Sequence, residues 1–381
     1  MREEMLESIY NSKRNVLVSG SMSVGKTTNI GYGIVDKIIE NDDNMFKLDS
    51  RCEYLKAYYD VLKDKNYDIK IINMSNFSKS VCYNIFKYCY DLYKNGDKDE
   101  ALKELDIICK NIFVYDGNGD DFWVNSARDL FSGIVLALFD DAKEDEINFS
   151  SIYSIISDCV GDVDYVAEYF RTKDMNDISY ICASASVFSP IETKGGIVAT
   201  AKEILKPFIN KPMLNSLLSK TDFDIKDLVN KKSAIFLISD EVDNELSSLS
   251  SIIISQIYSI LLKENKNTCY NFVLDNFDTI NNIANFRGML SSSIYNNVKF
   301  YIFTRDKKRM ESKYLSYLKK ICDYIFVKEE NIVINNSNFE YENKFEVIDI
   351  KNSNIVYPSM KKGVTQIFNL KKFIIDNIKI D

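Results

Sequence analysis

A glycine-rich segment near the start of the chain constrains the fold more than any other feature. Residues 15–28 read NVLVSGSMSVGKTT, and they match the pattern G-x-x-x-x-G-K-[ST] of a phosphate-binding loop through Gly20, Gly25, Lys26 and Thr27. The glycines let the backbone curl so that its N–H groups point at a phosphate. The lysine brings positive charge to the β- and γ-phosphates, and the threonine hydroxyl can coordinate Mg²⁺. A glycine turn could match this pattern by chance, so its context matters.

That context is a strand followed by a helix. Residues 16–18 are apolar and predict a short buried strand, and residues 28–40 predict a helix whose N-terminus faces the bound anion. We therefore predict a site for ATP and Mg²⁺, with Lys26 also acting in catalysis and Thr27 as a metal ligand. The predicted nucleotide-binding residues are Gly20, Ser23, Gly25, Lys26, Thr27 and Thr28.

Strand and helix patterns alternate on both sides of the chain's middle. The first part predicts strands at 45–49 and 69–73 with a helix at 51–63 between them. After residue 221, further strands are predicted at 234–238, 270–275 and 299–304, with helices at 246–263 and 283–294. Such alternation is typical of a doubly wound parallel sheet, here an α/β, RecA-like P-loop fold. Ligands of these sheets bind at the carboxyl ends of the strands.

Two predicted strands end in an aspartate at that edge. Asp275 ends a predicted strand, 270–275, that contains four apolar residues, and it could deliver a carboxylate to the Mg²⁺ held by Thr27, although it could instead cap the next turn. We assign it the magnesium role. Asp49 ends another strand, and we expect it to orient water or Lys26.

The middle of the chain has a different pattern. Helical spacing predicts helices at 83–92, 101–110, 122–139, 149–157, 165–170 and 198–209. Strand-like runs are nearly absent, so we predict an all-α domain inserted into the α/β domain. Short strands near 323–327, 332–334 and 345–350 predict a sheet edge or a small C-terminal β-element. We predict a nucleotide-binding domain in two parts, 1–81 and 221–335. An all-α insertion spans 82–220, and a C-terminal β/tail segment spans 336–381.

Composition excludes several functions. The chain of 381 residues has no histidine, and its eight cysteines form no C-x-x-C pair, which argues against a zinc site. The longest apolar run, 130–139, is too short to span a bilayer, and the N-terminus is unlike a signal peptide. We expect a cytoplasmic protein without a transmembrane segment. A net charge of −8 leaves DNA contact to a local basic patch, and the basic stretch 305–320 is either that patch or a solvated helix face.

These motifs together resemble the coupling-protein ATPases of type IV secretion and conjugation, and the resemblance extends over nearly the whole chain. Residues 15–28 match that family's first motif. The segment LDSRCE at 48–53 is similar to its D-x-K-G-E segment, with Arg51 for lysine and Cys52 for glycine. The segment SVCYNIFKY at 80–88 is similar to its S-x-x-Y-N-P-x-x-Y stretch, with isoleucine in place of proline.

The resemblance implies a hexameric P-loop motor that delivers DNA to a transfer channel. Implied partners are single- or double-stranded DNA, a relaxase-type nucleoprotein, further copies in a homo-hexamer, and a membrane-anchored transfer complex. The sequence has no segment resembling the family's N-terminal membrane helices, so we expect no membrane anchor within these residues. Localisation is therefore expected to be cytoplasmic, either free or peripheral at the inner face of the membrane.

Three departures from the family concern hydrolysis. Asn276 stands where the family has the glutamate that polarises water, and an amide cannot accept a proton. Thr304 stands in place of a glutamine that senses the γ-phosphate in the family. The family also has arginines before this strand that are candidates for reaching a neighbouring subunit's nucleotide, and their positions are occupied here by Ile294 and Asn296. Two hypotheses follow: a DNA-transfer ATPase with weak hydrolysis, or a nucleotide-binding, non-hydrolysing adaptor. A small-molecule kinase is disfavoured because it leaves the helical insertion without a role.

Overall fold

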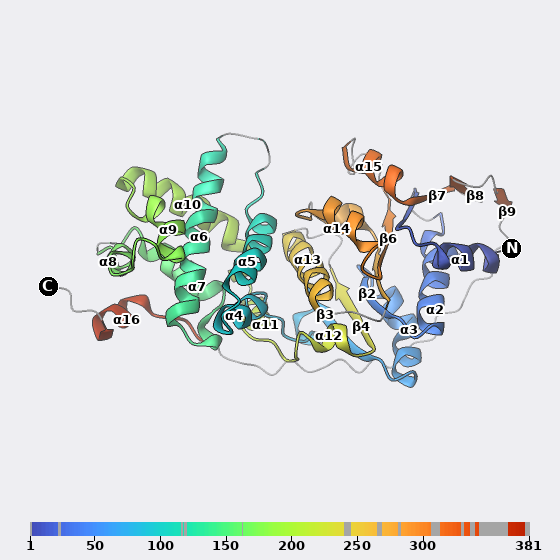
Figure 1. Ribbon diagram of the computed structural model, residues 1–381, viewed down its shortest axis with the longest axis horizontal. Helices are drawn as coiled ribbons and strands as arrows, with labels where there is room; N and C mark the ends of the chain where they lie inside the picture. Colours follow the sequence, from blue (N-terminus) through green and yellow to red (C-terminus); the bar gives the residue numbers. More distant parts are fainter. Residues whose placement is uncertain are drawn as a thin grey trace. The chain divides into compact units, whose positions relative to one another are not determined.

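The computed structural model describes the chain in segments and divides it into two compact units (Figure 1). Unit 1 comprises Met1–Ser80 and Phe223–Pro358, and unit 2 comprises Val81–Asp222 and Ser359–Asp381. The described residues are 2–21, 24–115, 117, 120–161, 163–239, 245–264, 269–280, 283–305, 313–328, 331–335, 340–342 and 365–377.

Unit 1 is built on one sheet with the strand order β3-β4-β2-β5-β6-β1-β7-β8-β9. The strands from β3 to β7 in this order pair in parallel, and β8 and β9 add antiparallel pairs at one edge. The sequence prediction of a doubly wound parallel sheet is confirmed. The strand bounds are β1 Val16–Gly20, β2 Asn44–Leu48, β3 Asp68–Asn73, β4 Ser233–Ile238, β5 Tyr270–Leu274, β6 Val298–Thr304, β7 Asp323–Lys328, β8 Asn331–Asn335 and β9 Glu340–Glu342.

Helices cover both faces of this sheet because its strands are apolar on both faces. On one face, Val18, Val273 and Phe303 share a buried cluster with Ile34 and Leu55. On the other face, aromatic rings of β5 and β6 pack against α13 and α14. The helices of unit 1 are α1 Arg2–Asn11, α2 Tyr32–Glu40 with a preceding π-turn Thr27–Gly31, α3 Glu53–Asp64, α12 Asp227–Asn230, α13 Ser247–Glu264, α14 Phe286–Ser293 and α15 Lys313–Ile321.

The C-terminal strands differ in part from their prediction. The stretch near 323–327 forms β7, which pairs in parallel with β1 and so extends the main sheet beside the phosphate loop. The stretch near 332–334 forms β8, an antiparallel edge strand. The strand predicted at 345–350 lies outside the described residues.

Helices joined by turns and loops make up unit 2, and its described residues contain no strand. Its central helix is α6, which packs closely on α9: a Cβ atom on Gly133 would lie 2.5 Å from the Cβ of Ala183. Sequence periodicity missed α9 and α11; α9 is rich in serine and alanine, which give little hydrophobic periodicity. The helices are α4 Lys87–Lys94, α5 Lys98–Ile112, α6 Asp121–Asp141, α7 Phe149–Asp158, α8 Tyr165–Arg171, α9 Ile178–Val187, α10 Ile191–Ile209, α11 Pro212–Leu218 and α16 Leu370–Asn377.

The C-terminal residues 365–377 pack onto unit 2, although the sequence analysis placed them in a separate tail segment. The backbone N–H of Phe368 donates a 3.0 Å hydrogen bond to Ser151 Oγ, and Asn148 Nδ2 donates to the carbonyl of Gln366 at 2.7 Å. Phe368 and Ile374 are buried against the helices. Phe368 precedes α16, and the burial of its ring and of the apolar side chains of α16 supplies the driving force for this docking.

Within the described residues, α6 is the helix that is long and apolar enough to cross a membrane. It extends beyond the apolar run at 130–139 to take in acidic residues at both ends. More than half of its most apolar window, 56%, is buried inside the structure. That burial is typical of a core helix, and α6 is the central helix of unit 2.

A buried asparagine ties the phosphate loop's strand to the rest of unit 1 and generates a stability prediction. Asn15 Nδ2 donates to the carbonyl of Leu290 at 2.9 Å, and its Oδ1 accepts from the N–H of Phe300 at 2.9 Å. Asn15→Ala leaves both backbone groups buried and unpaired, so we expect it to cost about 2–4 kcal/mol of unfolding free energy. Urea unfolding measures this cost. The control Asn11→Ala removes an exposed amide and should change stability by less than about 0.5 kcal/mol; equal effects of the two substitutions would contradict the prediction.

Candidate nucleotide-binding site

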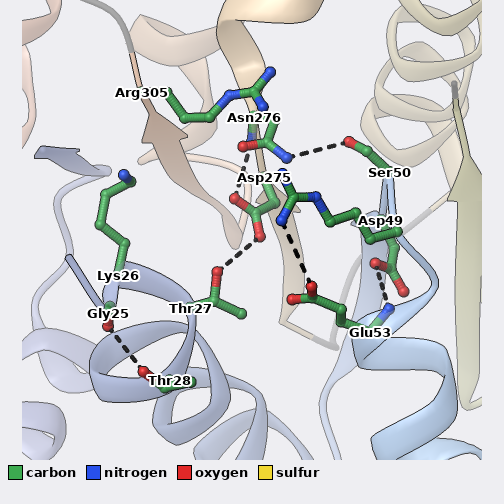
Figure 2. Close-up of a pocket in the computed structure, with 11 residues that line it drawn as sticks. Gly25, Lys26, Thr27, Thr28, Asp49, Ser50, Glu53, Asp275, Asn276 and Arg305 are labelled. Carbon is green, nitrogen blue, oxygen red and sulfur yellow. Dashed lines mark hydrogen bonds and ion pairs between the residues drawn. The ribbon is translucent and has the colours of Figure 1, made fainter. Parts of the chain in front are cut away.

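A pocket of about 270 Å³ opens at the carboxyl ends of the central strands of unit 1 (Figure 2). It collects side chains from the phosphate loop and from the residues that directly follow β2, β5 and β6. This is the edge at which doubly wound sheets bind ligands. The residues lining it are Gly25, Lys26, Thr27, Thr28, Asp49, Ser50, Arg51, Glu53, Asp275, Asn276 and Arg305.

Both motif glycines are required by the geometry of the loop. A Cβ atom on Gly20 would lie 2.4 Å from the carbonyl oxygen of Val327 in β7. Gly25 has φ of +80°, a left-handed conformation that L-residues rarely adopt, and a Cβ there would lie 2.4 Å from Asn29 Nδ2. Thr28 Oγ1 donates to the carbonyl of Gly25 at 3.3 Å. The predicted contribution of Ser23 lies outside the described residues.

The side chain of Lys26 is held over the phosphate loop by backbone carbonyl groups of that loop. Its Nζ donates to the carbonyl oxygens of Gly20 at 2.9 Å and Ser21 at 2.7 Å. Burial lowers the pKa of Lys26, while Asp275 is the largest influence that raises it. Figure 2 shows the lysine extending along the pocket on the same side as Thr27. An ammonium group with two neutral carbonyl partners can exchange them for charged phosphate oxygens, which bind it more strongly.

Two oxygen ligands converge where the sequence predicts a magnesium ion. Thr27 Oγ1 lies 3.4 Å from Asp275 Oδ2, and the N–H of Asn276 donates to Asp275 Oδ1 at 2.9 Å. Hydroxyl and carboxylate oxygens are the ligands that Mg²⁺ prefers, with phosphate oxygens and water completing its coordination. Among the described residues no group of three His, Cys, Asp or Glu side chains forms an all-protein metal site. Thr27 and Asp275 therefore fit an ion that is shared with a nucleotide.

Asp49 lies at the same edge because β2 and β5 are neighbours in register. Leu48 pairs with Leu274, so the two aspartates that follow them emerge side by side. The carboxylate of Asp49 accepts hydrogen bonds from the N–H groups of Glu53 at 3.1 Å and Leu55 at 2.9 Å, and so it caps α3. Burial raises the pKa of Asp49 to about 6. Its predicted role in orienting water or Lys26 stays a prediction.

The two positions associated with hydrolysis differ in their access to the pocket. Asn276 lines it, in a left-handed conformation with φ of 50°, and its Nδ2 lies 3.4 Å from Ser50 Oγ. Thr304 is 2% exposed, and within the described part of the chain its Oγ1 has no hydrogen-bond partner. Thr304 does not line the pocket, but the next residue, Arg305, does.

Sequence reasoning missed the role of Arg305, which it grouped with the basic stretch. Arg305 directly follows β6, and its backbone N–H donates to Asp278 Oδ1 at 2.9 Å. Its Nε lies 3.6 Å from Asp278 Oδ2. The signal was available, because a residue that directly follows a central parallel strand lies at the ligand edge, as Asp275 does. The basic residues Lys307, Lys308 and Arg309 lie outside the described residues, and Lys319 and Lys320 are exposed.

The raised pKa of Asp49 generates a stability prediction. The unfolded chain loses this proton near pH 3.8 and the folded chain near pH 6, so between these values the folded state binds more protons. The contribution of Asp49 to the unfolding free energy therefore falls by about 3 kcal/mol as the pH rises from about 4 to about 6. Above about pH 6 this contribution no longer changes. Urea unfolding of the wild type and of Asp49→Asn should give a difference that changes through this window. A difference that is independent of pH would contradict the assignment.

Comparison with solved structures supports the fold. TrwBΔN70, a bacterial conjugative coupling protein solved with sulphate, has a TM-score of 0.61 at 12% identity, over 83% of this chain and 70% of its own. The plasmid coupling protein TrwB in complex with ADP and Mg²⁺ has the same TM-score at 13% identity, over 82% and 70% of the two chains. VirB4 of Thermoanaerobacter pseudethanolicus has a TM-score of 0.50 at 11% identity, over 87% and 89%.

A search of curated proteins finds no match to this chain. The family of type IV secretory system conjugative DNA transfer proteins, in contrast, matches residues 10–346, which include the phosphate loop, the helical unit and the aspartates of the pocket. The earlier resemblance rested on these segments in this order. Because the match covers most of the chain, the protein belongs to the type IV secretory system conjugative DNA transfer family.

Proposed function

We propose that this chain binds Mg-ATP in the pocket of unit 1 and couples that binding to the transfer of DNA or a nucleoprotein, while hydrolysing ATP very slowly. The observation that carries the proposal is the convergence of three nucleotide-binding side chains at a place where the described residues include an amide instead of a general base. Lys26, Thr27 and Asp275 meet at one edge of the sheet, whereas an amide, Asn276, occupies the position beside Asp275. An ion shared by the hydroxyl, the carboxylate and the phosphates would neutralise charge on the nucleotide.

Among the described residues, three other carboxylates at or beside the pocket have neighbouring partners of their own. Asp49 caps α3, and Glu53 lies 3.9 Å from the guanidinium of Arg51. Asp278 is paired with Arg305. A general base must be able to accept a proton from water at hydrogen-bond distance, and these contacts compete for the oxygens that would do so. Slow turnover follows from this arrangement.

Family membership supports the identity of the partner to which nucleotide binding is coupled. Membership in a conjugative DNA transfer family supports DNA, or a relaxase-type nucleoprotein, as the partner. A ring of copies and a membrane-anchored transfer complex are the corresponding assembly partners. If ATP is bound but not hydrolysed at all, the chain acts instead as an adaptor that assembles beside an active motor. Turnover measurements separate these two functions.

Nucleotide binding is tested by removing the loop lysine. Lys26→Ala deletes a charge-assisted phosphate contact worth about 1.5–3 kcal/mol, so we expect affinity for Mg-ATP to fall at least about tenfold in calorimetry. Lys37→Ala is the control. Lys37 lies on α2, the helix that follows the phosphate loop, but it pairs with Glu7 and Glu40 at the surface. Equal affinities of the Lys26→Ala variant and the wild type would exclude the proposed site.

Hydrolysis is tested by restoring the missing carboxylate. Asn276→Glu should raise turnover, because a general base contributes about 10²–10⁴ in rate where the rest of the site is competent. Replacing asparagine at φ of 50° strains the backbone by about 1 kcal/mol, so Asn276→Ala serves as the matched control for strain without a carboxylate. Single-turnover assays with and without single-stranded DNA measure the effect. A rapid wild-type ATPase that depends on Lys26 and responds to DNA would contradict slow hydrolysis.

A further inference from the structure

A lysine is buried in the centre of the sheet, directly behind the predicted magnesium ligand. Lys47 lies on β2 and is 0% exposed. Its Nζ is 3.9 Å from Asp275 Oδ2 and 3.5 Å from the centroid of the Tyr54 ring. Within the described part of the chain this ammonium nitrogen has no hydrogen-bond partner. A lysine without hydrogen bonds at such a depth is costly and calls for a compensating interaction.

A second buried lysine shows how this sheet satisfies a lysine that only supports structure. Lys299 on β6 donates to three carbonyl oxygens at the end of α1, those of Ile9, Tyr10 and Ser12, at 2.5–2.9 Å. Lys47 has no such acceptors among the residues that the structure describes. Its partners are instead an aromatic face and the carboxylate of Asp275, and both interact with a cation through its charge.

The aromatic partner is held in place by its own packing. Tyr54 is 1% exposed, and its ring meets the edge of Tyr32 at a centroid distance of 5.1 Å. Its hydroxyl lies against Gly31, where a Cβ atom would be only 1.9 Å away. Because the helix after the phosphate loop carries a glycine at this point, the Tyr54 ring can lie under Lys47. The ring and the strand together fix the position of the ammonium group.

We propose that Lys47 is a positioning residue, an internal counter-ion for Asp275 that reduces the dependence of nucleotide binding on Mg²⁺. The inference rests on the proposed nucleotide site. The same carboxylate oxygen, Asp275 Oδ2, lies 3.4 Å from Thr27 Oγ1 and 3.9 Å from Lys47 Nζ, so the charge that would meet a metal ion is already partly neutralised by the lysine. Burial lowers the pKa of Lys47, and the Asp275 carboxylate is the largest opposing influence.

Two effects of this charge act in the same direction. Without metal, Lys47 weakens the repulsion between the carboxylate of Asp275 and the phosphates of the nucleotide, so the metal-free nucleotide binds more tightly. With metal, Lys47 competes with Mg²⁺ for the same carboxylate, so the ion adds less. The ratio of the nucleotide dissociation constant in EDTA to that in Mg²⁺ is therefore small in the wild type and rises when the charge of Lys47 is removed.

Calorimetric titration with ADP, in EDTA and in excess Mg²⁺, measures this ratio without any dependence on turnover. Lys47→Met replaces the charge with an apolar side chain of similar length, and Lys47→Gln is a second variant that remains polar. Lys70→Met is the matched control. Lys70 lies on β3 and has the same two kinds of partner, a carboxylate (Asp68, 2.8 Å) and an aromatic ring (Phe223, 5.5 Å to its centroid), but it is partly exposed and does not line the pocket. Asp275→Asn and the double variant Lys47→Met/Asp275→Asn complete a cycle that isolates the pair.

We expect Lys47→Met and Lys47→Gln to raise the ratio at least about tenfold, Lys70→Met to leave it unchanged, and Lys47→Met to have no effect in the Asp275→Asn background. An unchanged ratio in folded Lys47→Met and Lys47→Gln overturns the inference while leaving the nucleotide site intact. An equal rise in the Asp275→Asn background also overturns it, because the effect would not pass through Asp275. Failure of the wild type to bind ADP in either buffer overturns the proposed function and this inference with it.

Discussion

The parallel pairing of β2, β5, β6 and β1 is the constraint on which the rest of the site depends. Because all four strands run in one direction, the residues that follow them emerge at one edge. The contact of 3.4 Å between Thr27 and Asp275 joins residues 248 positions apart in the chain. No local interaction could bring them together; the register of the sheet does so, and the helical unit can be inserted between the strands without changing that register.

Close packing around the phosphate loop buries the charged groups of the pocket, and burial disfavours their charged forms. Gly20 and Gly25 are required because backbone and side-chain atoms occupy the space that a Cβ would fill. The same closeness buries ionisable groups: burial raises the pKa of Asp49 and lowers that of Lys26. Three charged groups at this edge therefore have close partners: carbonyl oxygens for Lys26, backbone N–H groups for Asp49 and Arg305 for Asp278. These pairings occupy oxygens that could otherwise accept a proton.

The residues that follow the central strands show how far the sequence could predict the site. Asp275 could be predicted because a run of apolar residues precedes it and marks the strand's end. Arg305 has the same position after β6, but neighbouring basic residues masked its role by making the whole segment look like a charged surface. The helix α9 was missed because serine and alanine give little hydrophobic periodicity, and it packs through small residues against Gly133 of α6 instead.

The sequence by itself determined the phosphate loop, the alternation of strands and helices, the helical insertion and the two aspartates at strand ends. It did so because each of these features is written in local spacing: four residues between glycines, an apolar run before an acid, a period of 3.6. Only the tertiary structure decided that Arg305 reaches the pocket, that Asp49 caps a helix, and that Lys47 lies behind Asp275. Those facts depend on strand order and on the burial of charge, and neither is encoded in the residues next to them.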